Sequence, residues 1–178
     1  HMLRAAFSGK DHETMVNGVT SLKQWTNKMT ATIVYDSNKD PFTEGGFFNK
    51  IQGKQNIALI GFTTDGDVFG GFYSVAVTEQ DKKFNDPDAF IFSFESRGRC
   101  ATPRRFVLKK NKVGYIKMLK DNNRANFFEF GGSGGQWACY FTLGNQRSDS
   151  YCHHLSEDFE GLQDMTLTGN TFKDNGPY

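Results

Sequence analysis

The side chains with the clearest chemistry in this sequence are basic, and they lie together in one segment. Residues 97–124, the basic segment, contain ten lysines and arginines against a single acid, Asp121, which makes a net charge of +9. The whole chain of 178 residues carries +1, so the remainder must carry −8. A local excess of one sign indicates the charge of a partner better than the total charge does.

Seven residues of the basic segment are the candidate binding residues. They are Arg97, Arg99, Arg104, Arg105, Lys109, Lys110 and Lys112. The arginines are the more informative, because a guanidinium group can hold a carboxylate or a phosphate with two parallel hydrogen bonds. We expect an acidic protein surface as the partner. The alternative is a merely solvated face, since basic residues on exposed strands also protect sheet edges from aggregation.

A second interpretation of the basic segment is nucleic-acid binding, in transcriptional regulation for example. Phe106 and Tyr115 interleave with its basic residues, as aromatic residues do on some nucleic-acid surfaces. The sequence contains no helix-turn-helix, zinc-finger or RNA-recognition motif, however, and phenylalanine is frequent throughout the chain. This interpretation therefore rests on charge alone.

Three other motifs imitate ligand sites and miss their requirements. Residues 36–40 resemble the start of a calcium loop, but Pro41 and Phe47 stand where that loop needs a glycine and a bidentate glutamate. The glycines within residues 131–135 lack the Gly-Lys-Ser/Thr ending of a phosphate-binding loop. Residues 152–154 (Cys-His-His) are adjacent, whereas structural zinc takes four ligands in spaced pairs. We expect no metal and no cofactor.

The sequence proposes no reaction either. Nucleophilic catalysis needs a serine or cysteine, a histidine and an orienting acid. Apart from His1, the histidines are His12, His153 and His154, and none lies in a recognised nucleophile motif. The acidic residues are scattered singly. We expect a protein that is not an enzyme.

The composition favours one intracellular domain. The cysteines are odd in number (Cys100, Cys139 and Cys152) and no glycosylation sequon is present, which indicates a reducing compartment, cytoplasmic or nuclear. No apolar run approaches the ~20 residues that span a bilayer. His1 and Met2 resemble the remnant of an expression tag, so we expect a piece of a longer protein, with residues 1–20 as a lead-in and residues 21–178 as a single domain.

A first helix is expected to open at Ser21. Ser21 and Gln24 have the spacing of a capping box, in which the two side chains bond the first free backbone N–H groups. The helix would present Leu22, Trp25 and Met29 on one face.

A β-hairpin is expected within residues 56–77. Two apolar runs flank Asp65 and Gly66, a pair that suits a tight two-residue type I′ turn because both positions tolerate positive φ. Gly70 and Gly71 in the second strand predict a bulge or a place where another backbone approaches closely.

The other expected elements are short. A second helix covers residues 43–51, with Phe47, Phe48 and Ile51 as its apolar stripe. The remaining expectations are strands at 30–35, 89–94, 127–130, 136–143 and 165–168, a turn at 36–41, a polar loop at 78–88, and a hairpin over 106–119 that turns at 111–112. Many strands without β-α-β alternation predict a mainly β (α+β) fold of two packed antiparallel β-sheets with a few short helices.

On its ordered motifs the sequence resembles the TLDc domain family. The apolar strand, turn and Val-Phe-Gly-Gly-Phe of the hairpin and the Phe-Ile-Phe-Ser-Phe of residues 90–94 are its most specific parts. Leu22 with Trp25, the glycine run at 131–135 and Leu-Thr-Gly at 167–169 follow the family's order, so the resemblance covers roughly residues 20–170.

The resemblance implies a function as well as a fold. TLDc domains protect against oxidative stress and bind the vacuolar proton-pumping ATPase, with no settled catalytic residues. The resemblance therefore implies a non-enzymatic interaction domain. The family usually closes with an apolar strand bearing a Glu-Val-Trp-like sequence, and this chain ends at Tyr178 without one. We expect the domain to lack that strand here.

Overall fold

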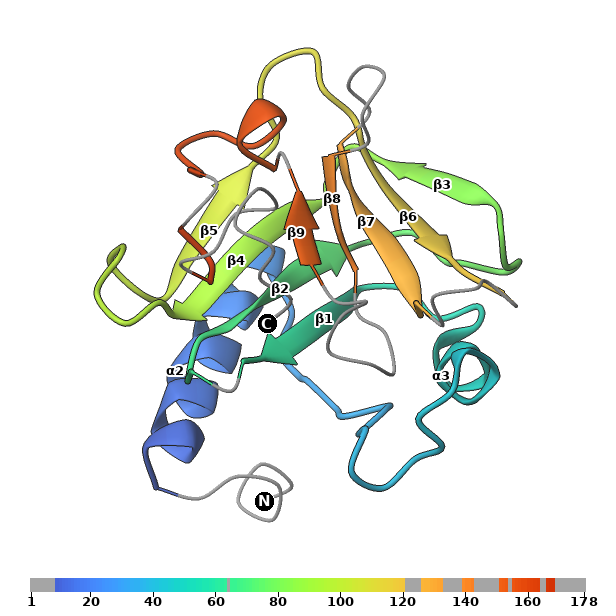
Figure 1. The fold of residues 1–178 in the computed structure, drawn as a ribbon, viewed down its shortest axis with the longest axis horizontal. Coiled ribbons are helices and arrows are strands. Elements are labelled where there is room, and N and C mark those ends of the chain that lie inside the picture. The colour runs from blue at the N-terminus through green and yellow to red at the C-terminus, as the bar shows by residue number, and fades with distance from the viewer. Residues whose placement is uncertain are drawn as a thin grey trace.

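The computed structural model describes residues 9–63, 65–120, 126–132, 139–142, 151–153, 155–163 and 166–168 (Figure 1). Within these residues, two antiparallel sheets are accompanied by two α-helices and one short 3₁₀ helix. The predicted mainly β, two-sheet fold class is therefore confirmed. None of the described helices is both long enough and apolar enough to cross a membrane.

The strands divide between a four-stranded and a five-stranded sheet. The first sheet has the order β1-β2-β4-β5, made of β1 (Ile57–Phe62), β2 (Val68–Tyr73), β4 (Phe90–Glu95) and β5 (Arg104–Val107). The second has the order β3-β6-β7-β8-β9, made of β3 (Lys83–Asp86), β6 (Gly114–Met118), β7 (Phe128–Gly132), β8 (Cys139–Thr142) and β9 (Tyr151–His153).

The main core lies between the two sheets. Side chains alternate between the faces of a strand, and on β2 this alternation turns Phe69 and Tyr73 inward, where they are 1 % and 0 % exposed. Ile116 and Phe130 of the second sheet meet them in the same buried cluster. Phe106 and Phe128 of the strands belong to the same cluster, so phenylalanines of both sheets build this core.

Helix α2 (Gly9–Thr26) covers the outer face of the first sheet and contacts β4. Met15, Val19 and Leu22 are buried against Phe72 and the outward phenylalanines of β4. These three residues repeat at the spacing of one helix face. The helix thus forms because it closes a second, smaller core.

The predicted start of this helix at Ser21 is wrong, because Ser21 lies in its last third. The helix continues upstream of the capping-box pattern because two further turns pack on β4. Gly18 lies in these turns against Phe94, so closely that a Cβ atom on it would be 2.3 Å from that ring. The helix ends at Asn27, which takes φ 54° while Lys28 N–H donates to Lys23 C=O at 3.0 Å. This is a Schellman motif. Met29, predicted on the buried face, is outside the helix and 88 % exposed.

Helix α3 (Glu44–Ile51) is confirmed with its predicted apolar stripe. Thr43 caps it, since its hydroxyl accepts from Gly46 N–H at 3.1 Å. Phe47, Phe48 and Ile51 are all buried in the main core.

The central hairpin is confirmed, but its turn is wider than predicted. The strands pair as far as Phe62 and Val68, and Thr63 N–H donates to Asp67 C=O at 3.0 Å, so the loop is not a two-residue turn. Gly66 takes φ 93° and donates to Thr63 C=O, which is the arrangement of a three-residue hairpin loop.

Gly70 of β2 lies where another backbone approaches closely, as predicted, whereas Gly71 lies against a side chain. A Cβ atom on Gly71 would be 2.8 Å from the ring of Phe130, so this glycine lets the two sheets approach. On Gly70 it would be 1.8 Å from the carbonyl oxygen of Leu59 on β1.

Replacing Gly70 with alanine should lower the free energy of unfolding by about 2 kcal/mol or more, because the obstacle is backbone and cannot rotate away. Gly45→Ala is the matched control, since nothing lies within 4 Å of its Cβ position in helix α3 and alanine favours helix. Chemical denaturation measures both changes. Equal stability of the two variants would contradict the close packing of β1 on β2.

Four other expectations are wrong. Residues 30–35 form no strand, the polar loop at 78–88 contains β3, and residues 166–168 form a turn. The expected hairpin over 106–119 does not exist, because β5 pairs with β4 whereas β6 pairs with β3 and β7. Only the turn between them is present, closed by Lys112 N–H donating to Lys109 C=O at 3.0 Å. The chain crosses from one sheet to the other there.

The turn at residues 36–41 is confirmed. The interpretation of residues 1–20 as a lead-in and 21–178 as one domain stays a prediction. The absence of a closing strand also stays a prediction, because residues 169–178 lie outside the described part of the chain.

Candidate interaction site

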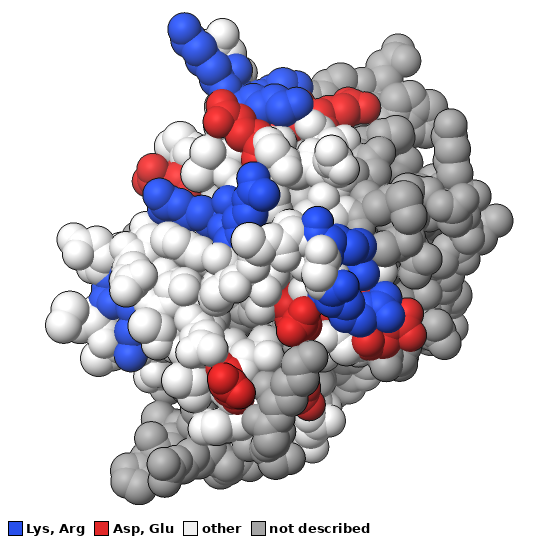
Figure 2. All heavy atoms as spheres, turned by 90° about the vertical axis from the view of Figure 1, so that its left-hand side faces the viewer, with Lys and Arg blue, Asp and Glu red and all other residues white. Residues whose placement is uncertain are grey.

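The basic segment does not form one continuous surface. Its described residues lie on β5, on β6 and on the loops around them. Figure 2 shows the side of the molecule that lies at the left in Figure 1, and the blue lysines and arginines form separate groups with acidic and uncharged residues between them. The seven candidates therefore have different surroundings.

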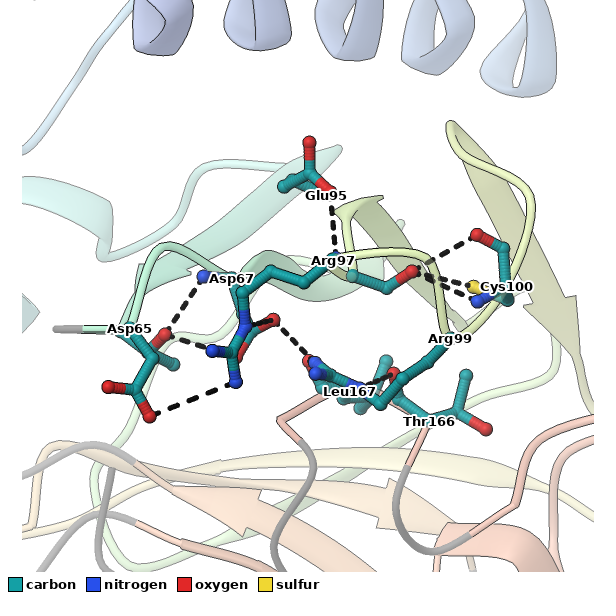
Figure 3. Close-up of polar contacts among 10 residues, drawn as sticks. Asp65, Asp67, Glu95, Arg97, Arg99, Cys100, Thr166 and Leu167 are labelled. Carbon is teal, nitrogen blue, oxygen red and sulfur yellow. Dashed lines mark hydrogen bonds and ion pairs between the residues drawn. The ribbon is translucent and has the colours of Figure 1, made fainter.

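Arg97 and Arg99 bind a buried carboxylate (Figure 3). Asp67, at the end of the β1–β2 loop, has a fully buried side chain. Its Oδ1 lies 3.2 Å from Arg97 Nε and is also paired with Arg99 Nη2. The hydroxyl of Thr63 donates to the other oxygen, Oδ2, at 3.2 Å. These contacts replace the water that a buried carboxylate loses.

The loop that carries the two arginines is held by its own hydrogen bonds. Arg97 and Gly98 take φ 51° and 86°, and Arg97 N–H donates to Glu95 Oε1 at 2.7 Å. The buried hydroxyl of Ser96 accepts from Cys100 N–H at 3.0 Å and donates to the Cys100 carbonyl at 3.1 Å. This local geometry turns both guanidinium groups toward Asp67.

Arg99 also binds the backbone of a segment far along the chain. Its Nε donates to Thr166 C=O at 3.2 Å and its Nη2 to Leu167 C=O at 2.9 Å. One side chain therefore joins the β1–β2 loop, the β4–β5 loop and residues 166–168 (Figure 3).

Lys109 and Lys112 make a second internal connection. Lys109 Nζ donates to Ser156 C=O at 2.7 Å, and Lys112 Nζ lies 2.7 Å from Oδ1 of Asp158, whose side chain is fully buried. Backbone bonds run beside them, with Lys109 N–H donating to Asp158 C=O at 2.8 Å and Glu160 N–H donating to Val107 C=O at 2.8 Å. Part of the basic segment is thus paired with residues 155–163.

Residues 155–163 carry three acids and no base, so they are an acidic partner within the chain itself. Leu155, Phe159 and Leu162 of this segment are buried in the main core. At about 1.5–3 kcal/mol for each buried side chain, their release would cost an amount comparable with the whole stability of a domain, about 5–15 kcal/mol. The segment is therefore part of the fold, and the lysines that hold it are not available to an external partner.

Arg104 and Arg105 lie on opposite faces of β5. Arg104 stacks on the inward Phe106, with its guanidinium carbon 4.9 Å from the ring centroid. Arg105 lies on the outer face, 5.9 Å from the ring centroid of Phe90, and its Nη1 donates to Trp25 C=O at 3.2 Å. Both residues are exposed. Lys110 is exposed at the tip of the loop after β5.

A groove of about 510 Å³ lies beside Arg105. It crosses one end of the four-stranded sheet, where residues next to β1, β2, β4 and β5 line it, and the end of helix α2 forms its wall. Its aromatic lining consists of Trp25, Phe72 and Phe90, and Lys28 and Arg105 supply its positive charge. Among the seven candidates, Arg105 is the residue that lines this groove.

The turn at residues 36–40 shows why a calcium interpretation is not needed. Asn38 N–H donates to Asp36 and, with the Lys39 ammonium group, holds the pKa of the Asp36 carboxyl below its usual range. A hydrogen bond from Lys50 and one from Asp36 N–H lower the pKa of Asp40 in the same way. The protein's own cations and N–H groups occupy these carboxylates.

The other motifs contribute no site that can be described. Gly131 and Gly132 are part of β7, and residues 133–135 lie outside the described part of the chain, as does His154. Cys152 and His153 fall on β9, where only the backbone is described. Among described residues, no group of three or more His, Cys, Asp or Glu side chains is placed to hold a metal ion.

The residues that give these basic side chains their roles were not found from the sequence. Asp67 and Asp158 lie far from residues 97–112 in sequence, so no spacing rule connects them with the basic side chains. For Trp25 a signal existed, since it was expected on the buried face of a helix, but nothing in the sequence placed that helix end beside β5.

Comparison with known proteins agrees with this fold. The family model for the TLDc domain matches residues 11–173. This confirms the resemblance that the motifs indicated, over a slightly longer range. No curated protein matches the chain at a significant level.

Proposed function

Because the chain belongs to the TLDc domain family, we propose that it is a non-enzymatic, intracellular protein-interaction domain. By analogy with the family, it acts in the response to oxidative stress and binds the vacuolar proton-pumping ATPase. Family membership is the observation that carries this proposal, and because a fold does not fix a function, the partner has to be tested directly.

The exposed basic residues support an acidic partner. Arg104, Arg105 and Lys110 are exposed on or just after β5, whereas Arg97, Arg99, Lys109 and Lys112 bind groups of the protein itself. An arginine on the surface can bind carboxylates in a bidentate way. Fewer basic residues are therefore available to a partner than the basic segment contains.

The direct test is retention of the chain by the purified vacuolar proton-pumping ATPase. At physiological salt the wild-type chain should be retained, and a bead control without the ATPase should retain nothing. Failure of the ATPase to retain the wild-type chain would overturn the assignment of this partner.

The second candidate function is nucleic-acid binding, which would use the same exposed residues. The net charge of +9 in the basic segment favours it. Nucleic-acid affinity that depends on phosphate contacts falls steeply with salt. Only residues that are not bound internally can supply those contacts without unfolding the domain.

The discriminating variant is therefore Arg104→Glu, Arg105→Glu and Lys110→Glu together, which leaves the internal ion pairs intact. We expect wild-type protein to bind duplex DNA weakly and without sequence preference, and the triple variant to lose that residual binding. Anisotropy of labelled duplexes over a salt series measures both. Tight, sequence-selective binding at physiological salt would make the nucleic-acid function the better one.

A further inference from the structure

We propose that the groove at the end of the four-stranded sheet binds a short acidic segment of the partner in an extended conformation, with Arg105 holding a carboxylate. This inference rests on the proposed interaction function and assigns it to one place on the surface.

The dimensions of the groove fit an extended peptide. It crosses four neighbouring strands, which spans about 14 Å at the usual interstrand spacing. An extended chain covers that length with about four residues. Its volume is about 510 Å³.

The lining provides an apolar contact on the β5 side of the groove. Val107 is 41 % exposed there, and Trp25 is half-buried. The rings of Phe72 and Phe90 are only 7 % and 5 % exposed and belong to the smaller core that helix α2 covers. An apolar side chain of the ligand would therefore contact Val107 and Trp25.

The charges favour an acidic ligand over a basic one. Arg105 and Lys28 both line the groove near the end of helix α2. The bond from Arg105 to Trp25 C=O uses one of the five N–H donors of the guanidinium group and leaves the others for a carboxylate. A basic ligand would place like charges beside these two residues.

The β1 and β2 side of the groove is polar. Asn56 and Ser74 line it there, and Ser74 already donates its hydroxyl to the buried Asp86 at 2.9 Å. The exposed carboxylate of Asp88 also lines the groove, just before β4, between this side and β5. A carboxylate accepts N–H or hydroxyl donors. The expected ligand therefore has an acidic and an apolar residue on the β5 side, beside Arg105 and Val107, and a hydrogen-bond donor toward Asp88.

Binding of three fluorescein-labelled peptides tests this inference. The probes are Gly-Asp-Glu-Phe-Leu-Asp-Ser-Gly, the same peptide with lysine for each acidic residue, and the acidic peptide with alanine for Phe and Leu. Anisotropy should show saturable binding of the first, with at least a tenfold weaker affinity for the other two. No saturation by the first peptide up to about 1 mM, or an equal affinity for the lysine peptide, would overturn the inference.

Two matched variants locate the binding. Arg105→Glu should weaken the acidic peptide at least tenfold, while Arg104→Glu, on the same strand but the opposite face, should change its affinity less than twofold. Equal effects of the two variants would contradict a site on the outer face. Circular dichroism and a thermal melt establish that both variants are folded. A third variant, Arg105→Gln, repeats the test without reversing the charge.

The outcomes separate this inference from the proposed function. If the ATPase retains wild-type and Arg105→Glu chains equally, the groove assignment fails while the interaction function stands. If the acidic peptide binds through Arg105 but the ATPase does not retain the chain, the groove stands and the assignment of that partner fails.

Discussion

Replacing Phe69 with alanine should lower the free energy of unfolding by about 3–5 kcal/mol, the usual loss for a buried phenylalanine. Phe69 lies on the central strand β2, is 1 % exposed and packs in the core between the two sheets. Truncation removes the buried ring and leaves a cavity that the rigid strands around it cannot fill.

Phe62→Ala is the control in the same hairpin, since Phe62 is 48 % exposed on β1. This substitution should lower the free energy of unfolding by less than about 1 kcal/mol, as most surface substitutions do. Guanidinium chloride unfolding of the three proteins measures the difference. A loss under ~1 kcal/mol for Phe69→Ala would mean that β2 does not lie in the core.

Replacing Arg99 with alanine should lower the free energy of unfolding by about 3 kcal/mol, because it removes one partner from a buried charge. Asp67 would keep Arg97, whose side chain is 45 % exposed, but would lose the more buried of its two arginines. The carbonyl groups of Thr166 and Leu167 would lose their donor as well.

Arg99→Lys and Arg104→Ala are the controls for this prediction. Lysine keeps the charge but cannot reach the carboxylate and two carbonyl groups with a planar fork, so it should recover only part of the stability. Arg104→Ala removes an exposed arginine of the same segment and should have little effect. If Arg99→Ala and Arg104→Ala are equally stable, Asp67 does not depend on Arg99.

Local patterns predicted the parts of this fold whose stability is local. The hairpin of β1 and β2 follows from two apolar runs around a turn, and helix α3 follows from its cap at Thr43 and its stripe of Phe47, Phe48 and Ile51. In both cases the pattern in the sequence and the packing in the core agree.

The wrong predictions concern elements whose boundaries and pairing depend on contacts between residues far apart in the sequence. Residues 106–119 contain two strands and a turn, and only the pairing partners, which lie elsewhere in the chain, reveal that the strands belong to different sheets. Helix α2 extends upstream of Ser21 because Met15 and Val19 close the outer core on β4. The pairing of the strands has no signature within the segment itself, whereas the helical spacing of Met15, Val19 and Leu22 was present in the sequence and was not used.

The same limit applies to the site. The sequence shows that ten basic residues lie within residues 97–124, but it does not show how they are used. Arg97 and Arg99 are directed inward by the carboxylate of Asp67, and Lys112 by that of Asp158. Arg105 is not directed inward, because it lies on the outer face of β5 beside the end of helix α2. The sequence predicted only the last part of that helix.

Among the seven candidate residues, Arg97, Arg99, Lys109 and Lys112 bind groups of the protein itself, Arg104 and Lys110 are exposed outside the groove, and Arg105 lines it. Titration of the acidic-aromatic peptide into the isotope-labelled protein, followed by two-dimensional NMR, tests this division. We expect shifts of the Trp25 indole and of the amides around Phe90, Arg105 and Val107, while the signals of Arg97, Arg99 and Lys112 stay unchanged. Shifts spread evenly over residues 97–112, with none at Trp25, would contradict it.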